Sequence, residues 1–109
     1  YKQKIVQAGD RATMTTGHSL GHPVRALKNP MAHEFEEMEK RGASEKEVIE
    51  FGTGRLRLAA TEGDMVRGSV MAGQISGMID DIVPCKELVE RIVCQAESTL
   101  RRVQANAWQ

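Results

Sequence analysis

Small residues crowd one stretch of the chain, residues 68–79, and this stretch limits the possible folds more than any other. It reads Gly-Ser-Val-Met-Ala-Gly-Gln-Ile-Ser-Gly-Met-Ile. Glycine inside a helix costs about 1 kcal/mol relative to alanine, so repeated glycines need a reason, and close approach of another group is one. We expect Ser69 to cap a helix whose first turn is Val70, Met71 and Ala72.

The start of such a helix would present backbone N–H groups that have no partner within the helix and carry partial positive charge. They could point at an electron-rich ligand such as a phosphate or a ring carbonyl. Ala72, Gly73, Ser76 and Gly77 would form a small-residue face that lets a flat ring or another backbone approach. Tight packing without a ligand explains the same spacing, so the residues alone leave both interpretations open.

Composition narrows the classes of partner. The 109 residues include 15 basic and 15 acidic side chains, which gives no long-range attraction to nucleic acid or to an anionic membrane. No apolar run approaches the roughly 20 residues that a membrane span needs. Aromatic residues make up only 4% of the chain, so its core must rely on aliphatic side chains and six methionines. Such a core suits a small bundle or a piece that packs against something larger.

Local signals predict most of the helices. Asn29 can cap a helix that begins at Pro30, and Ser44 with Glu47 matches a capping box. Residues 24–28 could be extended or a first helical turn. The remaining expected elements are a short helix over 1–8, a strand over 13–16, a loop over 17–23, helices over 30–41, 44–51 and 55–61, and a long helix after Pro84.

The long helix carries one apolar stripe over about five turns. The stripe consists of Leu88, Ile92, Val93, Ala96, Leu100 and Val103. This period of 3.6 residues is typical of a helix that packs one face against another surface. We place a boundary near Met65 to Gly68, where a charged helical region gives way to a small-residue, apolar one.

Several polar residues are candidates for chemistry. His18 and His22 have the spacing of a metal pair on a helix, but the glycines and Pro23 predict a loop there, so we expect no metal site. His33 is expected to be solvated on a charged helix. Arg25 lies between apolar neighbours and could bind a phosphate or carboxylate, although an arginine that ties a loop to a nearby carboxylate explains it equally.

The remaining candidates have ordinary interpretations. Cys85 and Cys94 would lie roughly 13 Å apart on one helix, too far for a disulfide, and fit reduced thiols in a cytoplasmic protein. The run Glu34–Glu39 is expected to be a solvated helix face, and its charge would repel an acidic carrier protein. Trp108 could stack on a ligand or pack against protein. No complete catalytic set or phosphate-binding loop motif is present.

Longer motifs carry a resemblance to a known family. Residues 68–77, preceded by Gly63-Asp64, closely resemble a signature near the C-terminus of the FMN-dependent enoyl-[acyl-carrier-protein] reductases. These enzymes belong with the nitronate monooxygenases in a flavin TIM-barrel family. Residues 21–29, with the pattern Gly-His-x-Val-Arg-Ala-x-Lys-Asn, and residues 1–5, with Tyr-Lys-x-Lys-Ile, also look like that family. The resemblance covers nearly the whole chain.

The resemblance implies an α/β TIM barrel for the parent protein, with this chain as its mostly helical C-terminal third carrying one or two short strands. Residues 1–65 would be the end of a barrel helix plus a small inserted domain, and residues 66–109 would return to the barrel. The catalytic histidine and the flavin-phosphate loop of the family would lie upstream. The partners implied are that missing barrel portion and a second subunit in a homodimer.

The reaction implied is reduction of a trans-2-enoyl thioester, bound to acyl carrier protein, by NAD(P)H through FMN in fatty acid elongation. The residues implied at the site form two groups. On the cofactor side are Ser69, Val70, Met71, Ala72 and Gln74, and on the substrate side are Met71, His22 and Arg25. A nitronate monooxygenase of the same fold is the nearest alternative, and a non-catalytic small helical interaction module is an alternative from another class.

Overall fold

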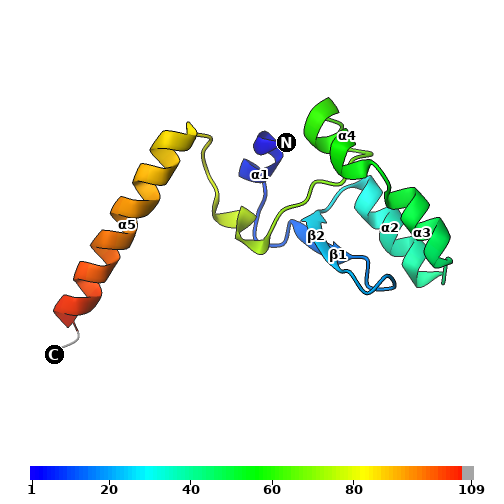
Figure 1. The fold of residues 1–109 in the computed structure, drawn as a ribbon, viewed down its shortest axis with the longest axis horizontal. Coiled ribbons are helices and arrows are strands. Elements are labelled where there is room, and N and C mark those ends of the chain that lie inside the picture. Colours follow the sequence, from blue (N-terminus) through cyan, green and yellow to red (C-terminus); the bar gives the residue numbers. More distant parts are fainter. Residues whose placement is uncertain (107–109) are drawn as a thin grey trace.

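The computed structural model describes residues 1–106 and shows a small helical layer around a two-stranded sheet, followed by one projecting helix (Figure 1). The elements follow in the order α1 (Lys2–Val6), β1 (Thr13–Thr16), β2 (Val24–Leu27), α2 (Pro30–Lys40), α3 (Glu45–Gly52), α4 (Arg55–Glu62), the 3-10 helix η1 (Gln74–Met78) and α5 (Cys85–Asn106). Trp108 lies outside the described residues.

The helix starts predicted at Asn29 and at Ser44 are confirmed. Asn29 is extended, and its side-chain oxygen accepts a hydrogen bond from the Ala32 amide at 2.8 Å, with Pro30 as the first helical residue. Ser44 and Glu47 form the reciprocal bonds of a capping box at the start of α3. Local side-chain to backbone bonding fixes these positions, which is why the sequence predicts them well.

The undecided segment 24–28 is mostly strand. β2 pairs antiparallel with β1, with Thr13 opposite Leu27 and Thr16 opposite Val24. The connecting loop begins at Gly17, which has a φ of +84°. A Cβ atom at Gly17 would lie 2.8 Å from the His22 carbonyl oxygen, so the hairpin requires glycine there.

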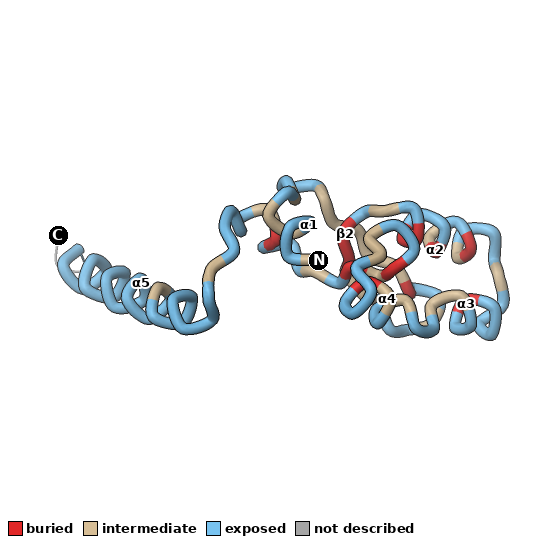
Figure 2. The backbone as a smooth tube through the Cα atoms, turned by 90° about the horizontal axis from the view of Figure 1, so that it is seen from above, coloured by how far each residue is buried: buried red, intermediate tan, exposed pale blue. Residues whose placement is uncertain are grey.

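Buried side chains form two small clusters rather than one core. Met31, Phe35 and Val48 pack together between α2 and α3. The second cluster joins β2 to α4 and consists of Leu27, Ala59 and Val70, with Tyr1, Ile5, Ala8, Ala12, Met65 and Ala72 packed around it. Figure 2 shows that the buried positions gather where β2 meets α2, α3 and α4, and that the other end of the molecule is almost entirely exposed.

The helix predicted to begin at Ser69 is absent, and this prediction was wrong. Residues 70–72 are extended along the free edge of β2, where the Leu27 amide donates to the Val70 carbonyl at 2.8 Å and the Ala72 amide donates to the Arg25 carbonyl at 3.2 Å. Helical turns begin only at Gln74, as the 3-10 helix η1. The unpaired edge of β2 offers backbone partners to a glycine-containing segment whose own helix propensity is poor.

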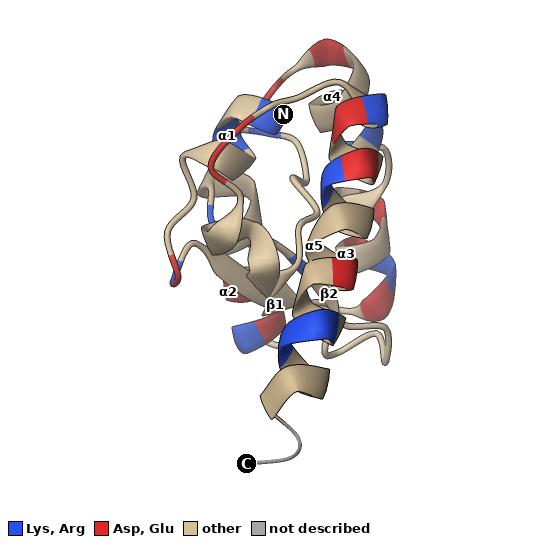
Figure 3. Cartoon of the chain, turned by 90° about the vertical axis from the view of Figure 1, so that its left-hand side faces the viewer, with Lys and Arg blue, Asp and Glu red and all other residues tan. Residues whose placement is uncertain are grey.

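The last helix, α5, extends away from the rest of the described chain (Figure 1). It has 22 residues and no buried side chain, so its predicted apolar stripe is exposed. Acidic and basic residues are interspersed along it (Figure 3), and Lys86 pairs with Glu90 and Arg101 with Glu97 one turn apart. Among residues 1–106, no helix combines the length and hydropathy needed to cross a membrane.

Candidate functional site

A cavity of about 170 Å³ lies where the hairpin loop, α2, α3 and the extended segment after Gly68 meet. Three residues that the sequence predicted at the site, His22, Ser69 and Met71, line this cavity together. The rest of the lining is mostly apolar and consists of Thr16, Gly17, Leu20, Val24, Met31, Phe35, Gly52 and Leu56. We call it the His22–Met71 cavity.

The other predicted site residues lie elsewhere, because an extended chain directs successive side chains to opposite sides. Val70 points away from this cavity and is only 2% exposed in the second cluster, against which Ala72 also packs. Gln74 is exposed on η1. The Arg25 guanidinium donates to the Thr13 hydroxyl at 3.1 Å, which ties β2 to β1.

The backbone of Met71 faces outward from the sheet. In the antiparallel bridge between Ala26 and Met71, the flanking residues supply the hydrogen bonds to β2, which leaves the N–H and C=O of Met71 pointing the other way. The Met71 carbonyl accepts from the Tyr1 hydroxyl. Within residues 1–106, the Met71 amide makes no hydrogen bond. A free N–H beside an apolar cavity can meet the edge of an electron-rich ring.

Asn29 fixes the segment that carries Ser69 and Met71. Its side-chain amide donates to the Met65 carbonyl at 2.9 Å and to the Gly68 carbonyl at 2.8 Å, while its oxygen caps α2. The sequence identified only the capping role, because the two carbonyls lie 36 and 39 residues further along the chain. The small-residue stretch is therefore positioned by a residue from the second resembling motif.

Gly68 shows what the glycines in this stretch do. A Cβ atom there would lie 2.6 Å from the Ala59 amide nitrogen and 2.7 Å from its Cβ atom, so the segment packs directly on α4. At Gly77 a Cβ atom would lie 3.1 Å from the Asp10 backbone. Tight backbone packing explains both glycines, and nothing at either position requires a ring.

Glu39 differs from the solvated face predicted for its helix. One of its carboxylate oxygens accepts from the Gly17 amide at 2.9 Å, and the other accepts from the amide and the hydroxyl of Ser19 at 2.8 Å each. Partial burial raises the pKa of Glu39, but these hydrogen bonds and nearby His18 outweigh it and hold the pKa below its ordinary value. The prediction of a solvated face is confirmed for Glu37, which is exposed and forms an ion pair with Lys40 at 3.3 Å.

The other predicted candidates show no site. His18 and His33 are exposed, as are the free thiols of Cys85 and Cys94 on α5. In the described part of the chain, no three metal-ligating side chains come close enough to hold an ion.

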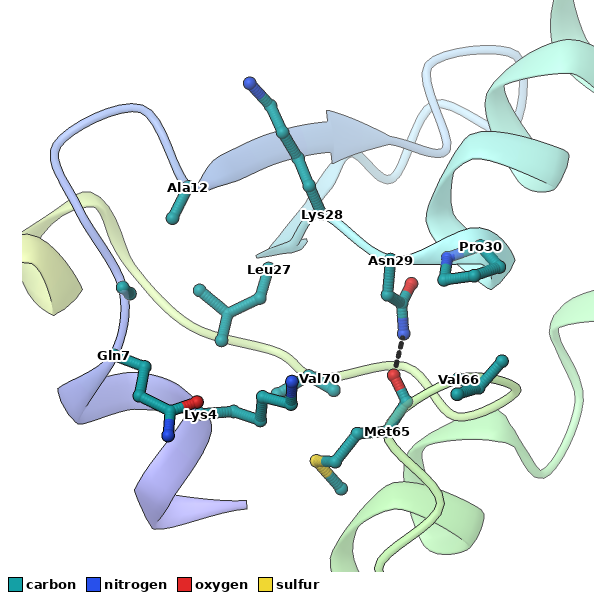
Figure 4. A pocket seen from close by; sticks show the side chains of 11 residues that line it. Lys4, Gln7, Ala12, Leu27, Lys28, Asn29, Pro30, Met65, Val66 and Val70 are labelled. Carbon is teal, nitrogen blue, oxygen red and sulfur yellow. Dashed lines mark hydrogen bonds between the residues drawn. The ribbon is translucent and has the colours of Figure 1, made fainter.

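A second cavity, of about 390 Å³, lies where α1, the end of β2 and the segment 65–70 meet (Figure 4). Leu27 and Val70 point into it, Asn29 and Met65 meet at one side through their hydrogen bond, and Lys4 reaches in from α1. The side chain of Lys28 points away from Lys4 (Figure 4). No local pattern in the sequence predicts this cavity, because its walls come from three separate parts of the chain.

Comparison with known proteins decides the family. The nitronate monooxygenase family model matches residues 1–95. The chain belongs to the nitronate monooxygenase family. Members of this family have a TIM-barrel fold, and the present chain forms a mostly helical part of such a barrel, as the sequence resemblance implied.

Solved structures of similar proteins cover almost all of this family member. FabK from Thermotoga maritima is 42% identical to it, with a TM-score of 0.88, over 96% of this chain and 33% of that chain. A methionine-to-alanine variant of the same FabK is 37% identical, with a TM-score of 0.78, over 96% of this chain and 30% of that chain. The chain thus spans about one third of the length of FabK.

A curated relative matches a shorter part. A hydroxy-methyl-oxo-octahydroindene-carboxyl-CoA dehydrogenase from Mycobacterium tuberculosis is 36% identical over 50 residues, which are 46% of this chain and 14% of that protein.

Proposed function

We propose that this chain is the C-terminal part of an FMN-dependent enoyl-[acyl-carrier-protein] reductase, which reduces a trans-2-enoyl thioester with NAD(P)H. The observation that carries the proposal is the similarity to FabK, at 42% identity over 96% of the chain, combined with the meeting of His22, Ser69 and Met71 at one cavity. Residues 1–65 would belong to the end of a barrel helix and an inserted domain, and residues 66–109 to the barrel.

The residues present fit one edge of a flavin ring. The outward-facing Met71 amide is a donor that a ring oxygen or nitrogen could accept from, and the Met71 side chain, 39% exposed, adds apolar surface beside it. The His22–Met71 cavity, at about 170 Å³, is smaller than the roughly 300–1,000 Å³ of a complete ligand site. The remaining walls, the phosphate contacts and the catalytic histidine would therefore come from polypeptide upstream of Tyr1.

Bound FMN would supply hydride transfer between NAD(P)H and the enoyl double bond. The residues of this chain would act by binding and orientation. Met71 would place an apolar surface and one backbone donor beside the ring, with Ser69 supporting the turn. His22, on the hairpin loop, would line the side from which the acyl thioester enters. The apolar walls formed by Leu20, Phe35 and the other lining residues would exclude water from the reacting carbons.

Nitronate oxidation is the second candidate, because the family model that matches residues 1–95 is that of the nitronate monooxygenases. The two candidates separate in one assay on the full-length protein. We expect NADH or NADPH oxidation to depend on added crotonyl thioester and an alkyl nitronate to be consumed slowly or not at all. Rapid nitronate consumption without thioester-dependent NAD(P)H oxidation would replace the first proposal by the second. A homodimer, also proposed, is tested by light scattering on the same sample.

A further inference from the structure

The loop that carries His22 is held by one side chain from outside the hairpin. Glu39 accepts hydrogen bonds from the backbone at two points of the loop, Gly17 and Ser19, and from the Ser19 hydroxyl. Hydrogen bonds to an ionised carboxylate are shorter and stronger than neutral ones. The carboxylate therefore fixes the first turn of the loop relative to the end of α2.

Glu39 lies on the same face of α2 as two residues that line the His22–Met71 cavity. Met31, Phe35 and Glu39 are spaced four residues apart on α2, so they lie one above the other on the same face. Met31 and Phe35 line the His22–Met71 cavity, and Leu20 of the loop packs against the cluster that contains them. The helix α2 therefore lines the cavity through Met31 and Phe35 and, through Glu39, also holds the loop that forms another wall of the cavity.

We propose that Glu39 is a positioning residue of the active site: by holding the turn at Gly17 and Ser19, it places Leu20 and His22 at the wall of the cavity. Glu39 itself does not line the cavity and would not touch substrate. Its effect on the reaction is therefore expected in substrate binding rather than in the chemical step. The reference to substrate rests on the proposed function, whereas the hydrogen bonds to the loop do not.

The variant that tests this is Glu39→Gln in the full-length protein with bound FMN. The amide has the shape of the carboxylate, but it has only one acceptor oxygen, so its NH2 group must face either the Gly17 or the Ser19 amide. Glu37→Gln is the matched control, because it removes the same charge from the same helix at an exposed position whose carboxylate pairs with Lys40. Ser19→Ala is a milder second variant that removes the hydroxyl bond and keeps the backbone bonds.

In Glu39→Gln we expect faster hydrogen exchange at the Gly17 and Ser19 amides, KM for crotonyl thioester raised about tenfold, and kcat and FMN affinity within about twofold of wild type. Ser19→Ala should raise KM about threefold, and Glu37→Gln should match wild type. Faster loop exchange with an unchanged KM would overturn the positioning role. A fall in kcat alone, or an equal effect of Glu37→Gln, would also overturn it.

The test separates this inference from the proposed function. If the wild-type protein consumes a nitronate and does not reduce the thioester, the proposed function fails. In that case KM for the nitronate and hydrogen exchange of the loop amides are compared between Glu39→Gln and wild type, and this comparison decides the role of Glu39. An unchanged KM for the nitronate in Glu39→Gln would overturn the positioning role.

Discussion

Asn29 joins two parts of the chain that are distant in sequence. Its oxygen caps α2 through the Ala32 amide, and its NH2 group bonds the carbonyls of Met65 and Gly68. An amide side chain is needed for this, because only a group with both an acceptor and two donors can do both. A single residue therefore sets the start of α2 and the path of the segment that leads to Met71.

Substitution separates the two roles of Asn29. Asn29→Asp keeps the capping oxygen but removes the donors to both carbonyls, so we expect it to lower the free energy of unfolding by about 1–3 kcal/mol. Asn29→Ala loses the cap as well, which adds about 1 kcal/mol. Urea denaturation of the full-length protein measures both changes. Equal stability of Asn29→Asp and wild type would show that the bonds to Met65 and Gly68 contribute little.

At the scale of elements, the stretch 68–73 shows where local sequence stops determining structure. The caps at Asn29 and Ser44 were predicted because their partners lie three residues away. The strand-like pairing of residues 70–72 depends on the edge of β2, more than 40 residues earlier. The family resemblance implied a site role for Met71, which lines the cavity, whereas the local sequence predicted the wrong backbone conformation for this residue. Similarly, the loop contacts of Glu39 could not be read from a run of glutamates.

The glycines of this stretch differ in what surrounds them, and this is testable. Gly68→Ala would place a methyl group within 2.7 Å of Ala59, and we expect a loss of about 1–3 kcal/mol in the free energy of unfolding, or more. Gly73→Ala is the control, because the nearest atom to its Cβ is the Ile75 Cγ2 at 3.9 Å. Thermal unfolding of both variants should show a lower Tm for Gly68→Ala alone. Similar values for the two would contradict the close packing of Gly68 on α4.

The hairpin loop should loosen in acid. The pKa of Glu39 is held below its ordinary value, so folding favours its ionised form. Its contribution to stability is complete above the ordinary carboxyl pKa of 4.5 and is lost as the pH falls through the lower pKa of the folded state. Hydrogen exchange at the Gly17 and Ser19 amides, corrected for the intrinsic pH dependence, should accelerate in that range. Glu39→Gln should show no such step.

At the scale of the whole molecule, residues 1–106 are extended rather than compact. The radius of gyration is 18.3 Å, whereas a compact domain of about 100 residues has about 13 Å. The helix α5 projects from the rest of the described chain (Figure 1), and the side chains of its apolar stripe are exposed there. A helix of this pattern is stabilised mainly by packing of its apolar face. We therefore expect the barrel portion proposed for the full-length protein to cover the stripe.

Two substitutions on α5 test this expectation. Ile92→Asp places a charge in the middle of the stripe and should lower the free energy of unfolding of the full-length protein by at least about 2 kcal/mol. Ser98 lies on the opposite face of the same helix, so Ser98→Asp should leave the free energy of unfolding nearly unchanged. The denaturant concentration at the midpoint of unfolding, measured for both variants, compares their stabilities. Equal, small effects would mean that the stripe remains exposed in the full-length protein.

The central claim is that the extended segment at Met71 lies against the flavin. The most direct test is the FMN affinity of Met71→Asp in the full-length protein, measured by flavin fluorescence, with Met78→Asp as the control because Met78 is 77% exposed on η1. A carboxylate beside the ring should weaken FMN binding by about tenfold or more, or lower turnover to a similar degree, while Met78→Asp behaves as wild type. Wild-type FMN affinity and turnover in Met71→Asp would contradict the account.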